Sequence, residues 1–100
     1  MRLIDERTPD GSRQFARLPK IAPWEVVRNH VLLLGSAKVV NYVAEGAVAP
    51  WLDFTFRGHR FVIHSHENQL RLFVCDPQCS DLILFEVGSH FERLLGEESV

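Results

Sequence analysis

Apolar and polar residues alternate in three consecutive runs, at positions 51–57, 60–66 and 69–75, which are separated by two short turn-forming segments. Side chains of a β-strand point alternately to opposite faces, so each run predicts one strand of an antiparallel meander. One predicted face is apolar apart from a single serine, and it comprises Leu52, Phe54, Phe56, Phe61, Ile63, Ser65, Leu70, Leu72 and Val74. We expect this face to pack against the rest of the core.

The opposite face of the same meander combines charged, histidine and aromatic side chains. It comprises Trp51, Asp53, Thr55, Arg57, Arg60, Val62, His64, His66, Gln69, Arg71, Phe73 and Cys75. Antiparallel sheets commonly bury one face and leave the other accessible. Any function of the sheet is therefore expected on this second face.

A helix is predicted upstream of the meander, from Pro23 to just before Gly35. Proline is favoured at the first helical position, and glycine directly after a helix end. Apolar residues at helical spacing form an inward stripe of Trp24, Val27, Val31 and Leu34. Residues 38–45 are rich in β-branched residues and favour a strand, although Ser36 could instead cap a second short helix. We interpret 38–45 as a strand.

Residues 80–95 allow two interpretations. A single helix accounts for the helical spacing of apolar residues through the whole segment, with Ser80 as a capping residue. The alternative is a buried strand over 82–87, followed by a short helix opened by a capping box at 89–92. We favour the single helix. Gly88 inside it costs about 1 kcal/mol relative to alanine, or is useful where the helix approaches a sheet closely.

These elements predict an α+β fold in the order α-β-β-β-β-α. The expected architecture is a two-layer sandwich, in which a four-stranded antiparallel sheet has two helices packed on one face. Residues 1–20 are polar, contain Pro9, Gly11 and Pro19, and show neither a helical nor a strand period. They are interpreted as a flexible N-terminal arm, which leaves residues 21–100 as a single α+β domain.

Composition and charge narrow the class of protein. The chain has 100 residues, of which 46% are hydrophobic and 24% charged, as expected for one soluble globular domain. The net charge of −2 disfavours nucleic acid as a partner, because no large basic field is available to attract phosphates. No run of 18 apolar residues predicts a membrane span, and the charged start of the chain is unlike a secretory signal. A cytoplasmic location is expected.

The two cysteines, Cys75 and Cys79, are expected to be free thiols, because two cysteines are too few for a secreted disulfide scaffold. Their spacing is not Cys-x-x-Cys, so it does not match a thioredoxin-like redox motif. Whether they are redox active stays open. A hydrolytic triad of Ser65, His64 and Asp53 is disfavoured, because neighbouring residues of one strand point to opposite faces.

The register predicts which polar side chains meet. With Gly58-His59 and Glu67-Asn68 as two-residue hairpin loops, one row across the sheet contains Asp53, His64 and Arg71. Directly opposed side chains lie about 4.5–5.5 Å apart at Cβ, so Asp53 is expected to hydrogen-bond His64.

Three interpretations of this face compete: a solvated surface without function, a surface for a protein partner or homodimer, and a metal or small-ligand site centred on His64 and His66. Zinc needs at least one further ligand, and Cys75 lies two rows from His64 in this register. Aromatic residues and arginine are enriched at interfaces, so we favour a protein-binding or homodimerising module without cofactor, metal or catalytic residues. A metal- or ligand-dependent protein or enzyme is the alternative. The expected binding residues are Trp51, Asp53, Val62, His64, His66, Arg71 and Phe73.

Overall fold

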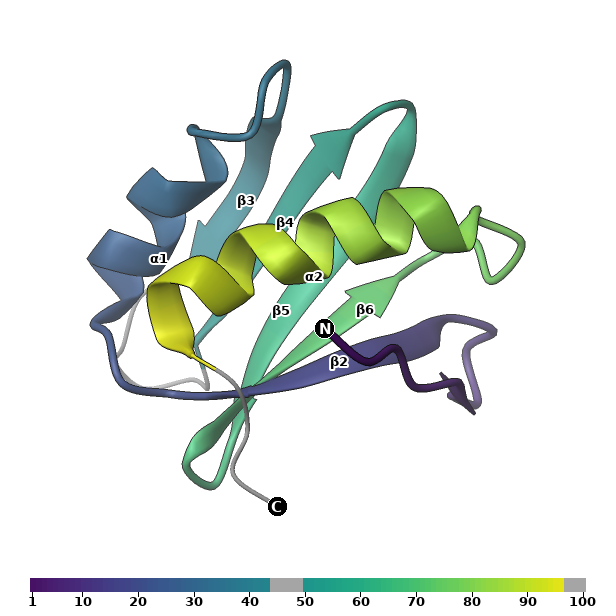
Figure 1. Ribbon diagram of the computed structural model, residues 1–100, viewed down its shortest axis with the longest axis horizontal. Helices are drawn as coiled ribbons and strands as arrows, with labels where there is room; N and C mark the ends of the chain where they lie inside the picture. Colours follow the sequence, from purple (N-terminus) through teal and green to yellow (C-terminus); the bar gives the residue numbers. More distant parts are fainter. Residues whose placement is uncertain (44–49, 97–100) are drawn as a thin grey trace.

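The computed structural model describes residues 1–43 and 50–96, and it places six strands in one antiparallel sheet of order β1-β2-β6-β5-β4-β3 (Figure 1). The strands are β1 (Glu6–Arg7), β2 (Arg13–Pro19), β3 (Lys38–Val43), β4 (Trp51–Phe56), β5 (His59–His66) and β6 (Gln69–Val74). The predicted meander is therefore present as β4, β5 and β6. The predicted strand at 38–45 is present as β3, and its last two predicted positions lie outside the described residues.

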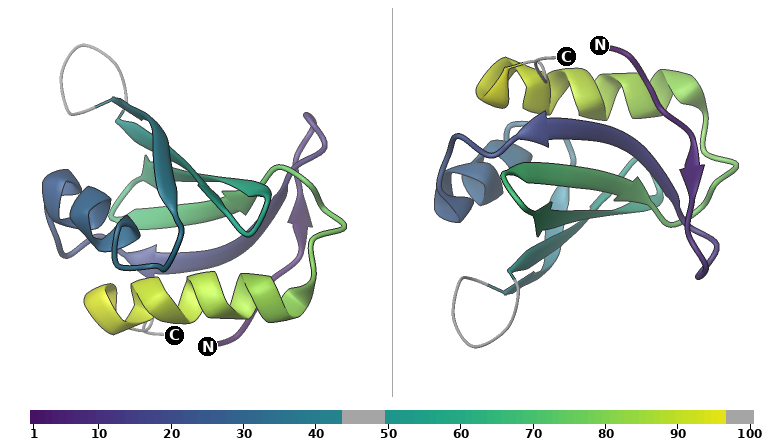
Figure 2. Two further views of the ribbon diagram at one scale, coloured as in Figure 1. Left: turned by 90° about the horizontal axis from the view of Figure 1, so that it is seen from above. Right: turned by 90° about the horizontal axis from the view of Figure 1, so that it is seen from below.

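Two helices, α1 (Trp24–Val31) and α2 (Asp81–Leu95), lie on the same side of the sheet (Figure 2). The single-helix interpretation of 80–95 is confirmed: the Ser80 side chain accepts a hydrogen bond from the backbone N–H of Leu82, and the helix ends at Gly96. Helix α1 is shorter than predicted and stops at Val31, because residues 32–35 continue as turns. Its predicted inward stripe is nevertheless buried.

The core lies between the helices and one face of the sheet. Every apolar member of the predicted inner face is at most 3% exposed, and Ser65 is half-buried. The centre of the core is aromatic: the rings of Phe54 and Phe61 stack at 5.2 Å, and Phe91 of α2 lies 5.9 Å from Phe54. The prediction that the meander has one core face is confirmed.

The expected four-stranded sheet is wrong, although the α+β class and the antiparallel sheet are right. Both additional strands come from residues 1–20, the segment expected to form a flexible arm. Strand β2 pairs with β6 along its whole length, from Arg13 opposite Val74 to Pro19 opposite Gln69.

Two physical features explain why β2 is not predicted from the sequence. A register shift between Gln14 and Ala16 marks a β-bulge, which puts both Phe15 and Ala16 in the core and breaks the period of two. The strand also begins with a buried arginine. Arg13 is only 8% exposed because its guanidinium donates to the Ile4 carbonyl and to Asp81 Oδ1, the latter at 3.0 Å. The sequence alone does not distinguish a buried arginine whose hydrogen bonds are satisfied within the protein from an arginine on the surface.

The β4–β5 hairpin differs from the expected register by two residues. Phe56 lies opposite His59, so the loop is Arg57-Gly58, and both loop residues have positive φ angles, 51° and 77°. Mirror-image hairpin turns need positive φ at both central positions, and glycine supplies it without strain at the second. The β5–β6 hairpin follows the prediction, with His66 opposite Gln69.

Candidate functional site: the open face of the sheet

The face of the sheet turned away from both helices is here called the open face (Figure 2). All seven residues expected to bind a partner belong to strands β4, β5 and β6, and their register partners place them on this face. Trp51, Val62, Arg71 and Phe73 are half-buried, His64 and His66 are exposed, and Asp53 is buried. The two rows described next contain six of the predicted residues, all but His66, together with Gln14 and Arg17 from β2.

The first row crosses four strands. Trp51 lies opposite His64, His64 opposite Arg71, and Arg71 opposite Arg17. The His64 ring also meets the edge of Phe73, with ring centroids 5.6 Å apart and an interplanar angle of 85°. The row thus places a histidine and two arginines next to each other, bordered by two aromatic rings.

The second row contains Asp53, Val62, Phe73 and Gln14, each opposite the next. The expected hydrogen bond between Asp53 and His64 is wrong, because the shifted register brings Val62 to that position. Arg60 Nη2 donates to Asp53 Oδ2 at 2.6 Å instead. This hydrogen bond, together with the attraction between the two opposite charges, raises the pKa of Arg60 above its usual value. Asp53 is therefore a paired structural carboxylate, 5% exposed.

His64 and His66 lie two positions apart on β5 and share the open face. Residues two positions apart on a strand are separated by about 7 Å. Within residues 1–43 and 50–96, no three histidine, cysteine or acidic side chains are grouped closely enough to hold a metal ion. His66 Nε2 lies 3.9 Å from Glu67 Oε1, which is exposed in the adjoining turn. The described part of the face therefore supplies no ligand set for zinc.

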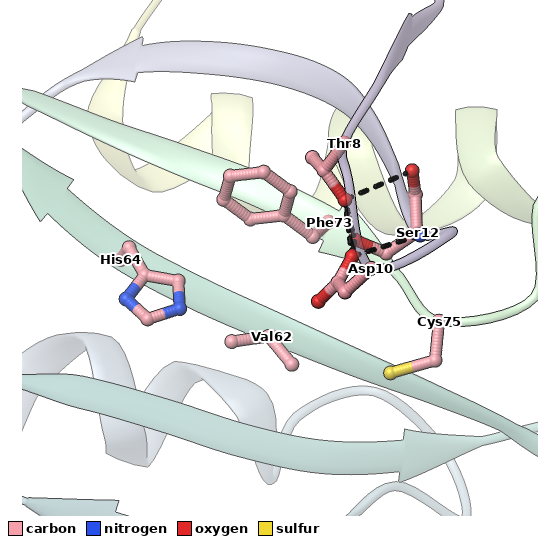
Figure 3. Close-up of a pocket in the computed structure, with 7 residues that line it drawn as sticks. All are labelled: Thr8, Asp10, Ser12, Val62, His64, Phe73 and Cys75. Atoms are coloured by element: carbon pink, nitrogen blue, oxygen red, sulfur yellow. Dashed lines mark hydrogen bonds between the residues drawn. The ribbon is translucent and has the colours of Figure 1, made fainter.

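A hollow of about 130 Å³ lies on the open face beside His64, under the turn that joins β1 to β2 (Figure 3). Its walls are Thr8, Asp10, Ser12, Val62, His64, Phe73 and Cys75. The turn is held by Asp10, whose Oδ1 accepts hydrogen bonds from the Thr8 hydroxyl, the Ser12 hydroxyl and the Ser12 backbone N–H. These bonds lower the pKa of Asp10 to about 2, so its carboxylate is charged at neutral pH.

The three residues of this turn, Thr8, Asp10 and Ser12, are absent from the predicted site because residues 1–20 were expected to form a flexible arm. A signal was available: Thr8-Pro9-Asp10-Gly11 is a turn sequence, with proline favoured at its second position, and Gly11 has a φ angle of 89°. A turn sequence of this kind indicates a hairpin at the start of the chain.

Neither thiol is activated. Cys75 is exposed at one wall of the hollow, and desolvation of its sulfur raises the pKa above the ordinary value despite the nearby Arg60 charge. Cys79 is buried, and burial likewise raises its pKa. Both cysteines are free in the structure, as the sequence predicts. The thiolate is the reactive form of cysteine, so the environment of each thiol disfavours nucleophilic chemistry near neutral pH.

No protein-family model, no curated protein and no solved structure matches this chain. Among the described residues, neither helix has the length and apolar character needed to cross a bilayer. Function must therefore be inferred from the geometry of the open face.

Proposed function

We propose that this protein is a small binding module that holds another protein against the open face of its sheet. The observation that carries the proposal is the combination of Trp51, Val62 and Phe73 with arginine on a face that neither helix covers. Interface cores are enriched in aromatic residues and arginine, and the residues that dominate binding energy cluster near the centre of the contact.

The charge of the open face argues for a different protein over a second copy as the partner. A twofold symmetric interface places the same patch of both copies against each other. A dimer axis between Arg17 and Arg71 would bring these arginines against the same arginines of the second copy. Like charges in contact are unfavourable, so a symmetric dimer through this part of the face is disfavoured.

The experiment uses three purified proteins to capture a partner protein. They are the wild type, the double variant Trp51→Ala/Phe73→Ala, and a matched control. The control, Leu33→Ala/Leu82→Ala, removes apolar surface of similar kind from positions that are 73% and 84% exposed on the helix side. A partner bound by the wild type and the control, but lost from the Trp51/Phe73 variant, is then purified and its affinity measured.

Three outcomes decide the proposal. A direct dissociation constant that rises at least about tenfold in the Trp51/Phe73 variant, with the control unchanged, supports the open face. Equal binding by all three proteins rejects it. Light scattering over a wide concentration range tests self-association. A concentration-independent dimer of the wild type, broken only in the Trp51/Phe73 variant, would show that the partner is a second copy of this chain and not a different protein.

The hollow beside His64 favours one further candidate, a small-ligand function. Its volume of about 130 Å³ is below the roughly 300–1,000 Å³ typical of pockets that enclose a cofactor or drug-sized ligand. A space of this size suits one side chain of a bound protein better. Saturable chemical-shift changes at His64 and His66 on adding zinc, together with metal retained after purification, would favour the ligand function instead.

A further inference from the structure

We propose that Arg71, flanked by Arg17 and His64, is an anion-binding site that takes a carboxylate from an acidic segment of the partner. The inference rests on the proposed function, because it specifies the chemistry of the protein that the open face would bind. It begins from an arrangement that is unfavourable in the isolated chain.

Arg17 and Arg71 lie directly opposite each other on neighbouring strands β2 and β6. Directly opposed side chains are about 4.5–5.5 Å apart at Cβ, and like charges at this distance destabilise a sheet. His64 lies opposite Arg71 on the other side, so no neighbour in this row supplies a negative charge to Arg71. Glu6 already pairs with Arg17, so an anion placed over the row would neutralise Arg71, the guanidinium of the two that has no carboxylate partner among the described residues.

Hydrogen bonding distinguishes Arg71 from the other arginines of the sheet. In the described strands, each of the other arginines forms an ion pair with a carboxylate: Arg7 with Asp5, Arg13 with Asp5 and Asp81, Arg17 with Glu6, and Arg60 with Asp53. Across the described part of the chain, no carboxylate pairs with Arg71. The Nε atoms of Arg17 and Arg71 are both covered from solvent, and neither has a hydrogen-bond partner.

The surroundings favour a carboxylate on a peptide. A guanidinium presents several N–H donors in one plane, which matches the two oxygens of a carboxylate. Phe73 follows Arg71 two positions along β6 on the same face, and Trp51 ends the row beyond His64. An acidic side chain between apolar side chains would place its carboxylate on Arg71 and its neighbours on these two rings.

The test is a nuclear magnetic resonance titration that follows the arginine Nε–H signals and the backbone amides of the full chain. The probes are a blocked peptide with one glutamate between two leucines, the same peptide with glutamine, and inorganic phosphate. Each is added to about 10 mM, tenfold above a millimolar dissociation constant. The variant is Arg71→Gln, and the control is Arg57→Gln, which removes the same charge from an exposed hairpin turn.

The proposal expects saturable shifts at the Arg71 and Arg17 Nε–H signals with the glutamate peptide. Its affinity should be about tenfold weaker for the glutamine peptide and for Arg71→Gln, and unchanged for Arg57→Gln. Equal binding of the two peptides, no binding, or tighter binding of phosphate would each overturn it. Loss of partner capture in Trp51→Ala/Phe73→Ala but not in Arg71→Gln would overturn the carboxylate site alone and leave the proposed function standing.

Discussion

The histidine pair between α1 and α2 gives the sharpest prediction about stability. His30 and His90 stack with ring centroids 3.9 Å apart, and the Nε2–H of each ring donates to the backbone carbonyl of the other residue, at 2.7 and 2.6 Å. Replacing His90 by phenylalanine keeps a stacked ring but removes one of the two bonds. A hydrogen bond of this kind contributes about 0.5–1.5 kcal/mol, so His90→Phe should cost about 1 kcal/mol of unfolding free energy.

The pH dependence of this cost has a definite sign. Burial, followed by the charges of His30 and Arg93, keeps the pKa of His90 below its ordinary value, although the hydrogen bond to the His30 carbonyl opposes the shift. Because Nε2 carries the proton of the neutral ring, the added proton must go to Nδ1, which lies 3.4 Å from Arg93 Nη2. The folded state therefore binds this proton less readily than the unfolded chain does.

A group with a lowered folded-state pKa stabilises the fold fully above its unfolded pKa, about 6.5 for histidine, and this stability is lost as the pH falls through the folded-state pKa. The wild type should lose it on acidification, whereas His90→Phe has no such proton to bind. The stability gap between the two proteins should therefore shrink between about pH 7.5 and about pH 5.

Thermal unfolding followed by circular dichroism measures this gap. At about pH 7.5 the melting temperature of His90→Phe should be roughly 4–8 °C lower, the shift that 1 kcal/mol produces in a domain of up to 100 residues. His66→Phe, which replaces an exposed histidine on the open face with the same residue type, is the matched control and is measured over the same pH range. A gap that is constant with pH, or that widens on acidification, would refute the reasoning about His90.

Three other predictions follow from the core, the α2 helix and the thiols. Phe91→Ala should lower the unfolding free energy by about 3–5 kcal/mol in urea denaturation, because the ring is fully buried; a loss under about 2 kcal/mol would contradict this. Gly88→Ala should change the same quantity by less than about 1 kcal/mol, since the gain in helix propensity opposes the displacement of Met1, whose Cε lies 2.6 Å from the added Cβ. Iodoacetamide should alkylate Cys75 and Cys79 more slowly than free cysteine near neutral pH, because desolvation raises both pKa values; alkylation as fast as free cysteine would argue against it.

Residues 51–74 could be assigned to the two sheet faces from sequence because the alternation of apolar and polar residues is a local pattern. Each residue needs only its neighbours to reveal a period of two, and the apolar side chains that share this period are buried in the structure. The pairing register of β4 with β5 was harder to predict from the sequence. Choosing Gly58-His59 over Arg57-Gly58 as the hairpin loop moved every β4–β5 pair by two residues, which keeps the faces but changes the partners.

Strand β2 could not be recognised because the evidence for it is not local. The paired residues of β2 and β6 are at least 50 positions apart in the chain, and the bulge at Phe15 removes the alternation that would identify a strand. Gly88 illustrates the same limit within a helix. The sequence suggested a close approach between α2 and the sheet, whereas the space in front of Gly88 is occupied by the side chain of Met1.

The missing strand also explains why the candidate site was incomplete. Without β2, Arg71 would lie in an edge strand and could extend into solvent. With β2 beside it, the Arg71 Nε is covered and faces a second arginine. The Asp53–Arg60 end of the open face neutralises its own charge, but the Arg17–Arg71 end keeps a cation without a carboxylate partner among the described residues. Discrimination between partners should therefore depend on the β2–β6 end, where a partner without an anionic group would leave the Arg71 guanidinium uncompensated beside Arg17.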